Sequence, residues 1–596
     1  MEPNQRIGRL LESRAALPVM MAVAAAIGLG AAWFWSPTYD ESNHLEMGRR
    51  ILQRWDFSRF DNSKMPVSLF NALGWSLADG GRVGWWLARL PQIGWLLGTA
   101  AVVARWGTRI GGRAAGAIAA GFVLFDPNLL AHSALVTTDA PCTFFVVLTS
   151  YLTWRALVDG GRKRWLLAGA IFGVAQAAKF TSVFLAPIVA IIWLAATLLR
   201  GGWRRNLVGA AIFSAAALVT LNSSYSWQGS FTRSSEIEWR SSTFAPLADV
   251  DLPLPFPRPW VEGLDWVKSD DDQGHGNIYL NGEMTPKGRD DYYLSAMGRK
   301  FPLPLLILAP LGLFWRRDGE REPLEKSALL AAPAFLLAWF SFAFNFQLGL
   351  RYILPVVPFF ALLTARLPTR VSFWGLPLLL ASTLSWWPWG LSYTNELTPR
   401  LEGWRYLADS NIDWGQGEYE VERWKAENEG GPFNPPVPLP GPSLLSANAL
   451  TGVLGDPGRF ECLREHLPPT EVIAAHLYPY DLTLAELEAC FPSVSPPPVE
   501  EGGFAAGEHL VALRFRGQGA LQIGEWREEA RSDAEVVIAA VVKAEGRFDI
   551  VVEHEGADVA LFIDGVRTEL PVAIAPEPVA PAEELEEGAS EGLPSP

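Results

Sequence analysis

The chain has 596 residues, of which 49% are hydrophobic, and its net charge at neutral pH is -15. The hydrophobic residues form long uninterrupted runs, which are typical of a membrane protein rather than of a soluble enzyme. The negative charge comes mainly from the residues after 400 and argues against a nucleic-acid-binding protein.

Apolar segments recur throughout the first two thirds of the chain. A membrane-spanning helix needs roughly 20 residues, and shorter runs tilt or thin the bilayer, so these segments predict about eleven spans. The segments cover residues 17–35, 85–106, 114–125, 144–158, 165–178, 181–199, 207–221, 303–315, 328–344, 352–365 and 371–391. We therefore expect an α-helical polytopic membrane protein with about 11 transmembrane helices.

Positive charges set the expected orientation. Arginine and lysine cluster in alternate short loops, at residues 105–113, 162–164, 200–205, 316–321 and 366–370. Because basic loops stay on the cytoplasmic side, the pattern predicts a multi-pass protein of the cytoplasmic membrane with an inside N-terminus and an outside C-terminus. The first apolar segment is interpreted as an uncleaved anchor.

The chain is expected to contain four parts. Residues 1–392 form the membrane domain, with long outside loops at 36–84 and 226–301. Mixed patterns, with a helix expected over 418–427 and a strand over 443–450, predict an extracytoplasmic α/β domain over 393–500. Alternating strands and the Asp564-Gly565 hairpin signal predict a β-sandwich-like domain over 501–574, and the Pro- and Glu-rich residues 575–596 predict a disordered acidic tail.

An acidic pair follows the first span directly, in the sequence Tyr39-Asp40-Glu41-Ser42-Asn43-His44. One interpretation is a helix N-cap made by Asp40 or Ser42. The other is catalysis, since transfer of a sugar from a lipid phosphate needs a base near the acceptor. It also needs cations, either a metal ion or Arg and Lys side chains, that hold the leaving phosphate.

Four further charged residues lie at or near the ends of spans. Arg89 lies inside the second span, where a charge is costly without a partner. Asp139 begins the fourth span, as an N-cap or as part of a site. Lys179 interrupts an apolar run, which favours a phosphate or carboxylate partner over snorkelling. Arg351 lies in an outside turn against the charge trend and therefore needs an anionic partner.

Two residues in outside segments are weaker candidates. His275 lies in a Gly-rich loop, where it contacts the donor phosphate or the acceptor, or is simply solvated. Trp414 stacks on a sugar, or belongs to a structural loop that docks on the membrane domain.

The order of these motifs resembles the GT-C superfamily of glycosyltransferases. It is most similar to bacterial members of the dolichyl-phosphate-mannose protein mannosyltransferase group, which are related to the lipid A aminoarabinose transferase. The resemblance rests on the segments Tyr39–His44, Leu87–Pro91, Thr137–Pro141, Ala178–Thr181, His275–Gly282, Lys300–Pro304, Asn345–Pro355 and Asp409–Gln416.

The resemblance implies a hexosyl- or pentosyltransferase that moves a sugar from a polyprenyl-phosphate donor to an acceptor outside the membrane, with inversion. It implies Asp40 as the base, Glu41 as a helper or metal ligand, and Asp139 as a third catalytic residue at the same membrane level. The implied donor-phosphate contacts are Arg89, Lys179 and Arg351, and the implied substrate contacts are His44 and His275. The enzyme works without a cofactor, or with Mg²⁺ or Mn²⁺ held by Asp40 and Asp139.

The acceptor stays open between a protein, a lipid and a glycan, because the MIR repeats of eukaryotic protein mannosyltransferases are absent and the soluble tail is larger than in the lipid A branch. Two other classes of protein remain as alternatives. One is a transporter or flippase of polyprenyl lipids, although the chain has no paired repeats. The other is a membrane-anchored carbohydrate-binding module.

Overall fold

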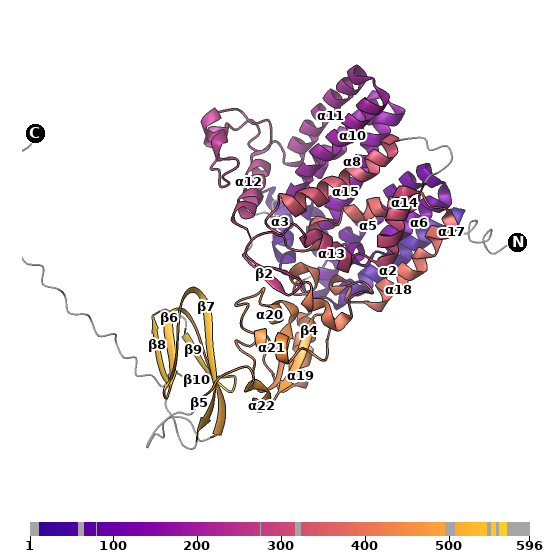
Figure 1. Cartoon of the computed structure of the whole chain (residues 1–596). Coiled ribbons are helices and arrows are strands. Elements are labelled where there is room, and N and C mark those ends of the chain that lie inside the picture. The colour runs from indigo at the N-terminus through magenta and orange to yellow at the C-terminus, as the bar shows by residue number, and fades with distance from the viewer. Residues whose placement is uncertain are drawn as a thin grey trace, which may run out of the picture. The chain divides into compact units, whose positions relative to one another are not determined.

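The computed structural model describes residues 11–57, 65–78, 80–274, 276–315, 323–494, 507–544, 550–555 and 559–568. The chain divides into two compact units (Figure 1). Unit 1 comprises Met1–Asn434 and Pro442–Tyr480, and unit 2 comprises Pro435–Gly441 and Asp481–Pro596. The predicted domain boundaries at 392/393 and 500/501 stay predictions.

Helices make up most of unit 1. The longer ones are α2 (Ala16–Phe34), α3 (Glu41–Arg54), α4 (Ser68–Trp75), α5 (Gly81–Gly111), α6 (Arg113–Leu124), α7 (Pro127–His132), α8 (Asp139–Asp159), α9 (Arg162–Ala175), α10 (Leu185–Arg200), α11 (Trp203–Ser224), α12 (Arg258–Gln273), α13 (Tyr292–Lys300), α14 (Leu303–Phe314), α15 (Pro323–Phe342), α16 (Val356–Thr364), α17 (Thr369–Phe373) and α18 (Gly375–Ser385). The short 3₁₀ turns that matter for the site are η1 (Phe180–Phe184), η4 (Leu350–Tyr352) and η7 (Asp409–Asn411).

Six described helical segments are long and apolar enough to cross a membrane. They are α2, α5, α8, η1 with α10, α11 and α15, and the bent pair α13–α14 makes a seventh if it is counted as one span. The protein is therefore a multi-pass membrane protein, but the expected total of about eleven spans stays a prediction. The other expected spans fall on shorter helices, such as the 12-residue α6 and the 14-residue α9.

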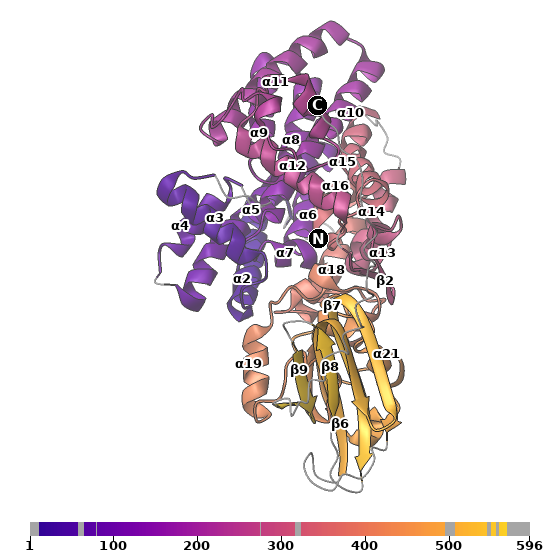
Figure 2. The same ribbon diagram turned by 90° about the vertical axis from the view of Figure 1, so that its left-hand side faces the viewer.

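Burial explains why some apolar helices are short. Residues Ala114–Leu124 of α6 are all buried inside the protein, so this helix contacts α5, α2 and α16 rather than lipid. The peripheral helices α10 and α11 instead expose leucine and valine side chains, among them Leu198 and Val208. In Figure 2 these two helices stand beside α8 and α9, where α10 packs on α8 and α11 packs on α9. Exposed apolar side chains on such helices are expected where lipid surrounds them.

The part of unit 1 that follows α18 is mixed in structure. It contains α19 (Glu418–Glu427), where a helix was predicted, together with α20 (Ala447–Thr451) and α21 (Glu461–His466). Strands β3 (Gly441–Ser446) and β4 (Leu477–Leu482) pair in a two-stranded sheet, and β1 (Ile278–Leu280) pairs with β2 (Glu283–Thr285) in the segment predicted as the second outside loop. The predicted strand at 443–450 ends early, because the Ser446 side chain caps α20 by accepting a hydrogen bond from Ala449.

Unit 2 is built on a sheet of six strands that follows α22 (Leu484–Leu487). The order is β10-β9-β6-β7-β5, and β8 also pairs with β6. The bounds are β5 Ser493–Val494, β6 Gly507–Ile523, β7 Trp526–Ala544, β8 Val551–Glu555, β9 Val559–Ile563 and β10 Val566–Thr568. The predicted Asp564-Gly565 turn joins β9 to β10, and Ile563 pairs with Val566. A register shift at Arg516/Gly517 separates the part of β6 that pairs with β9 from the part that pairs with β8.

Candidate active site

A small cavity of about 80 Å³ collects most of the predicted site residues. It is lined by segments that are far apart in the chain: the start of α3, the turn before α8, the turn between α9 and η1, α12, and η4. The lining residues are Asp40, His44, Thr137, Thr138, Asp139, Lys179, Phe180, Thr181, Val267, Arg351 and Tyr352. The structure thus brings five of the predicted site residues together, and their roles stay predictions.

Asp40 and Arg351 form an ion pair at one side of this cavity. The Nη1 group of Arg351 donates to Oδ2 of Asp40 at 2.6 Å, and the Asp40 side chain is 37% exposed. Burial favours a higher pKa for Asp40, but the Arg351 guanidinium outweighs burial and holds that pKa below its ordinary value. Asp40 makes no side-chain cap on α3, so the N-cap interpretation does not hold for it.

Asp139 and Lys179 form a second ion pair. The Nζ group of Lys179 donates to Oδ1 of Asp139 at 2.5 Å, and both groups are largely buried. The helix that Asp139 begins is capped by Thr138 without a side-chain hydrogen bond, so Asp139 is not an N-cap. Lys179 therefore has the carboxylate partner that its position in an apolar run required.

Several buried polar atoms around the cavity have no hydrogen-bond partner within the described part of the chain. They are Nδ1 of His44, Oδ2 of Asp139, Nε of Arg351 and Nδ1 of His132. Burial lowers the pKa of His44 and holds its imidazole neutral at physiological pH. Unpartnered buried polar groups are costly, so these atoms point to a polar ligand that completes their hydrogen bonds.

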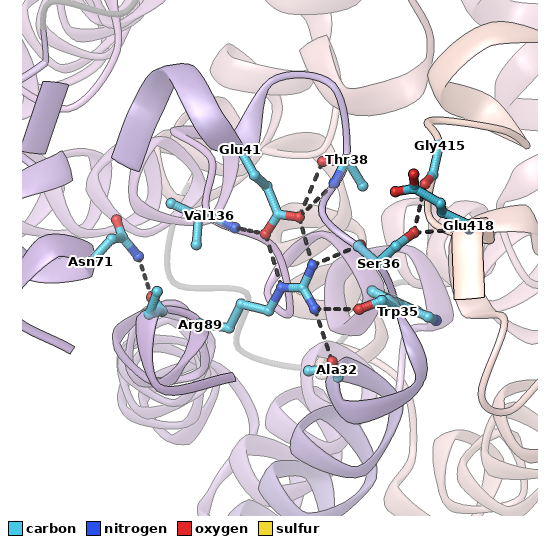
Figure 3. Close-up of polar contacts among 11 residues, drawn as sticks. Ala32, Trp35, Ser36, Thr38, Glu41, Asn71, Arg89, Val136, Gly415 and Glu418 are labelled. Atoms are coloured by element: carbon cyan, nitrogen blue, oxygen red, sulfur yellow. Dashed lines mark hydrogen bonds and ion pairs between the residues drawn. The ribbon is translucent and has the colours of Figure 1, made fainter. Parts of the chain in front are cut away.

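Arg89 and Glu41 do not line the cavity with the other predicted site residues. The two side chains, 1% and 0% exposed, bind each other, and the Nη2 group of Arg89 lies 2.6 Å from Oε2 of Glu41 (Figure 3). This is the pairing with an acidic neighbour that was the alternative for Arg89. The helper role of Glu41 and the phosphate contact of Arg89 stay predictions, and in this structure the two groups are each other's partners.

The site does not fit a divalent ion held by Asp40 and Asp139. Among the described residues, no group of three or more His, Cys, Asp or Glu side chains is placed to hold a metal. Each of the two carboxylates is instead paired with a basic side chain. A hard cation such as Mg²⁺ needs several oxygen ligands, which two carboxylates already paired with basic side chains do not supply.

His275 lies outside the described residues. Trp414 is 3% exposed and packs in a cluster with α2 and α7 residues, so it belongs to a docked structural loop rather than to a free sugar-stacking platform. Its ring also lies under Arg351, with the guanidinium carbon 4.5 Å from the ring centroid. Trp414 thereby helps to hold the arginine that pairs with Asp40.

Two residues at the site were missed in the sequence. Tyr352 lies below both cations, 5.0 Å from Lys179 Nζ and 5.6 Å from the Arg351 guanidinium carbon, measured to its ring centroid. His132 ends α7 and lies 3.8 Å from Asp139 Oδ2. The sequence could have indicated Tyr352, because it directly follows Arg351 in the predicted outside turn. For His132, only its position on a short turn was available.

The model of one protein family covers part of this site. Residues 67–227 match the dolichyl-phosphate-mannose-protein mannosyltransferase family. The matched residues include Arg89, Asp139 and Lys179, so the predicted resemblance is confirmed over this segment, which is less than half of the chain. Asp40 and Arg351 lie outside it. No curated protein sequence matches the chain.

Three solved structures are similar to the chain at low identity. ArnT from Cupriavidus metallidurans bound to undecaprenyl phosphate is 19% identical, with a TM-score of 0.44 over 63% of this chain and 64% of that one. The apo state of the same ArnT is 18% identical, with a TM-score of 0.39 over 62% of each chain. An Archaeoglobus fulgidus oligosaccharyltransferase tethered with an acceptor peptide is 12% identical, with a TM-score of 0.39 over 70% of this chain and 54% of that one. The chain thus spans less than two thirds of the length of each.

Proposed function

We propose that the protein is a glycosyltransferase that moves a sugar from a polyprenyl-phosphate donor to an acceptor on the outer face of the cytoplasmic membrane. The observation that carries the proposal is the composition of the cavity. It places a partly exposed carboxylate, Asp40, next to two cations, Arg351 and Lys179, with unpartnered polar atoms between them. Transfer from a lipid phosphate needs this combination of a base and a cationic phosphate site.

The proposed reaction is a single displacement with inversion. The donor phosphate binds Arg351 and Lys179, whose charges stabilise the phosphate as it leaves. Asp40 accepts the proton of the acceptor nucleophile while that nucleophile bonds to the anomeric carbon. The bond from this carbon to the phosphate oxygen breaks, and its electron pair departs with polyprenyl phosphate.

Donor binding also prepares the base in this scheme. In the free protein, Arg351 holds the pKa of Asp40 low, so Asp40 is a weak base. A phosphate that takes part of the hydrogen bonding of Arg351 weakens this hold, and the pKa of Asp40 rises toward a value more useful for proton transfer. The base therefore gains strength only when the donor is present.

The donor tail has a matching surface on the lipid-facing helices. An apolar groove of about 580 Å³ runs between α9, α10 and α11, lined by residues such as Trp165, Phe172, Ala210 and Phe256. Gln176, which also lines the groove, is three residues before Lys179 in the chain. We place the isoprenoid tail here, because the groove is apolar and begins next to a phosphate-binding lysine.

The test is release of polyprenyl phosphate from a sugar-labelled polyprenyl-phosphate donor by purified protein in lipid nanodiscs. A transporter or a binding module would leave the donor intact.

Asp40→Asn should lose about 100- to 10,000-fold in turnover, the rate enhancement that a general base usually provides, and still bind donor. The control is Asp290→Asn, which removes an exposed carboxylate far along the chain and should change neither quantity. Full activity of Asp40→Asn, or a product that keeps the anomeric configuration of the donor, contradicts the mechanism.

A further inference from the structure

Arg89 has no hydrogen-bond donor left for a ligand. A guanidinium carries five N–H groups. Its Nε donates to Glu41 Oε1 at 2.9 Å, and Nη2 donates to Glu41 Oε2 at 2.6 Å and to the Ser36 carbonyl at 2.9 Å. Nη1 donates to the carbonyls of Ala32 at 2.8 Å and Trp35 at 3.1 Å (Figure 3). A phosphate would have to replace bonds that the protein already makes.

Glu41 is occupied to the same degree. Besides Arg89, its Oε1 accepts the backbone N–H of Val136 at 2.7 Å, and its Oε2 accepts the N–H of Thr38 at 2.9 Å and the Thr38 hydroxyl at 3.3 Å. A carboxylate offers about four lone-pair sites. Glu41 is therefore fully used and buried, unlike its neighbour Asp40.

These bonds join the two segments that carry the cavity carboxylates. Thr38 and Glu41 flank Asp40 closely in the chain, and Val136 is three residues before Asp139. The Glu41 carboxylate touches both segments at once, and Arg89 fixes the carbonyls at the end of α2 from which the first segment emerges (Figure 3). The pair of Glu41 and Arg89 thus links the two backbone segments that carry Asp40 and Asp139.

Helix α5 supports the second segment as well. Gln92, one turn after Arg89, donates from Nε2 to the carbonyl of Thr137 at 3.0 Å and to Asn71 Oδ1 at 3.1 Å. Asn71 in turn donates to the Ala88 carbonyl at 2.7 Å (Figure 3). One face of α5 therefore holds the backbone on both sides of the cavity.

We propose that Glu41 and Arg89 are positioning residues that set the separation of Asp40 and Asp139, and that Arg89 does not bind the donor phosphate. The inference rests on the proposed function for its kinetic readout. Arg351 provides the contrast, because its Nη1 holds Asp40 while its buried Nε has no partner among the described residues. Among the described residues, Arg351 thus keeps an N–H group without a partner, whereas every N–H group of Arg89 is already bonded.

The experiment compares Arg89→Lys, Glu41→Gln and Lys179→Gln for donor turnover and for the dissociation constant of polyprenyl phosphate. Misplacement of a reacting group by about 1 Å costs about 100-fold in rate, so Arg89→Lys and Glu41→Gln should lose about that much turnover. Their dissociation constants should stay within about twofold, whereas Lys179→Gln should weaken binding by about tenfold or more, the usual effect of a lost charged hydrogen bond. The control Arg105→Lys replaces an exposed arginine of the same helix.

Two further measurements keep the test decisive. The double variant Glu41→Gln/Arg89→Gln leaves no single uncompensated charge, so it folds where a single variant fails. Its turnover should fall by about the same 100-fold as either single variant, because residues that act as one unit are not additive. Amide exchange of residues 36–42 and 136–139 should quicken in this variant, a readout that does not need transfer activity.

Weaker polyprenyl-phosphate binding in Arg89→Lys, equal to that in Lys179→Gln, overturns the proposal. So does unchanged amide exchange of both segments in the double variant. If wild-type protein transfers no sugar from any donor, the proposed function fails by itself, and the exchange measurement still decides whether the pair positions the two segments.

Discussion

At the scale of single residues, the basic side chains differ in whether they have hydrogen-bond donors left for a ligand. Arg351 and Lys179 each donate a side-chain hydrogen bond to a carboxylate and line the cavity. Arg89 is also an arginine, but all five of its N–H groups already donate hydrogen bonds within the protein. A phosphate ligand can therefore recruit the first two at little cost, because it exchanges one anionic partner for another.

The ion pair between Asp40 and Arg351 leads to a pH-dependence prediction. Arg351 lowers the pKa of Asp40, so in the wild-type protein the base stays ionised down to low pH and kcat/KM keeps its value there. In Arg351→Gln the main influence that opposes burial is removed and that pKa rises, so the acid limb of the kcat/KM profile should move to higher pH. Lys179→Gln is the control, since Lys179 pairs with Asp139 and should move the limb less. An acid limb that does not move in Arg351→Gln contradicts the role of Asp40 as the base.

The sequence predicted the residues of the site better than their partners. The cost of a charge inside a span showed that Arg89 and Lys179 needed partners, and both have one. It did not show which carboxylate each would take, because Glu41 is 48 positions from Arg89 and Asp139 is 40 positions from Lys179. Only the fold brings such pairs together.

At the scale of elements, the same limit appears in the helices. Helix α19 was predicted at its observed bounds because its sequence pattern is local. Residues 114–125 and 352–365 were predicted as spans, and the helices found there, α6 and α16, have 12 and 9 residues and are buried by neighbouring helices. Apolar length alone does not distinguish a helix that faces lipid from one that faces protein.

The groove between α9, α10 and α11 gives a prediction at this scale. Ala210 lines the groove, so Ala210→Trp should fill part of it and raise the KM for a long-chain donor by about tenfold, corresponding to loss of a few buried methylene groups. Turnover at saturating donor should stay unchanged, because the cavity carboxylates are untouched. Ala211→Trp, an exposed neighbour on α11 that does not line the groove, is the control. Equal effects of the two variants, or no effect with a long-chain donor, exclude the groove as the tail site.

At the scale of the whole molecule, the cavity belongs to unit 1 alone. Every residue that lines it lies between Asp40 and Tyr352, whereas unit 2 begins its main segment at Asp481. A variant truncated after Val494, which removes β6 to β10, should therefore bind polyprenyl phosphate as tightly as the full-length protein. Calorimetry or a fluorescence assay in nanodiscs measures this affinity, and a loss of more than about tenfold would show that the sheet supports the donor site.

The carbonyls that Arg89 binds belong to the end of α2, and this has a consequence for the surrounding lipid. Arg89 of α5 donates hydrogen bonds to carbonyls at the end of α2. Because of these bonds, the two helices cannot slide past each other along the membrane normal. In a bilayer thicker or thinner than their apolar length, they must tilt as one body, or the lipid must adapt around them. The level of Asp40 relative to α2 and α5 is then set by the protein and not by the thickness of the membrane that surrounds these helices.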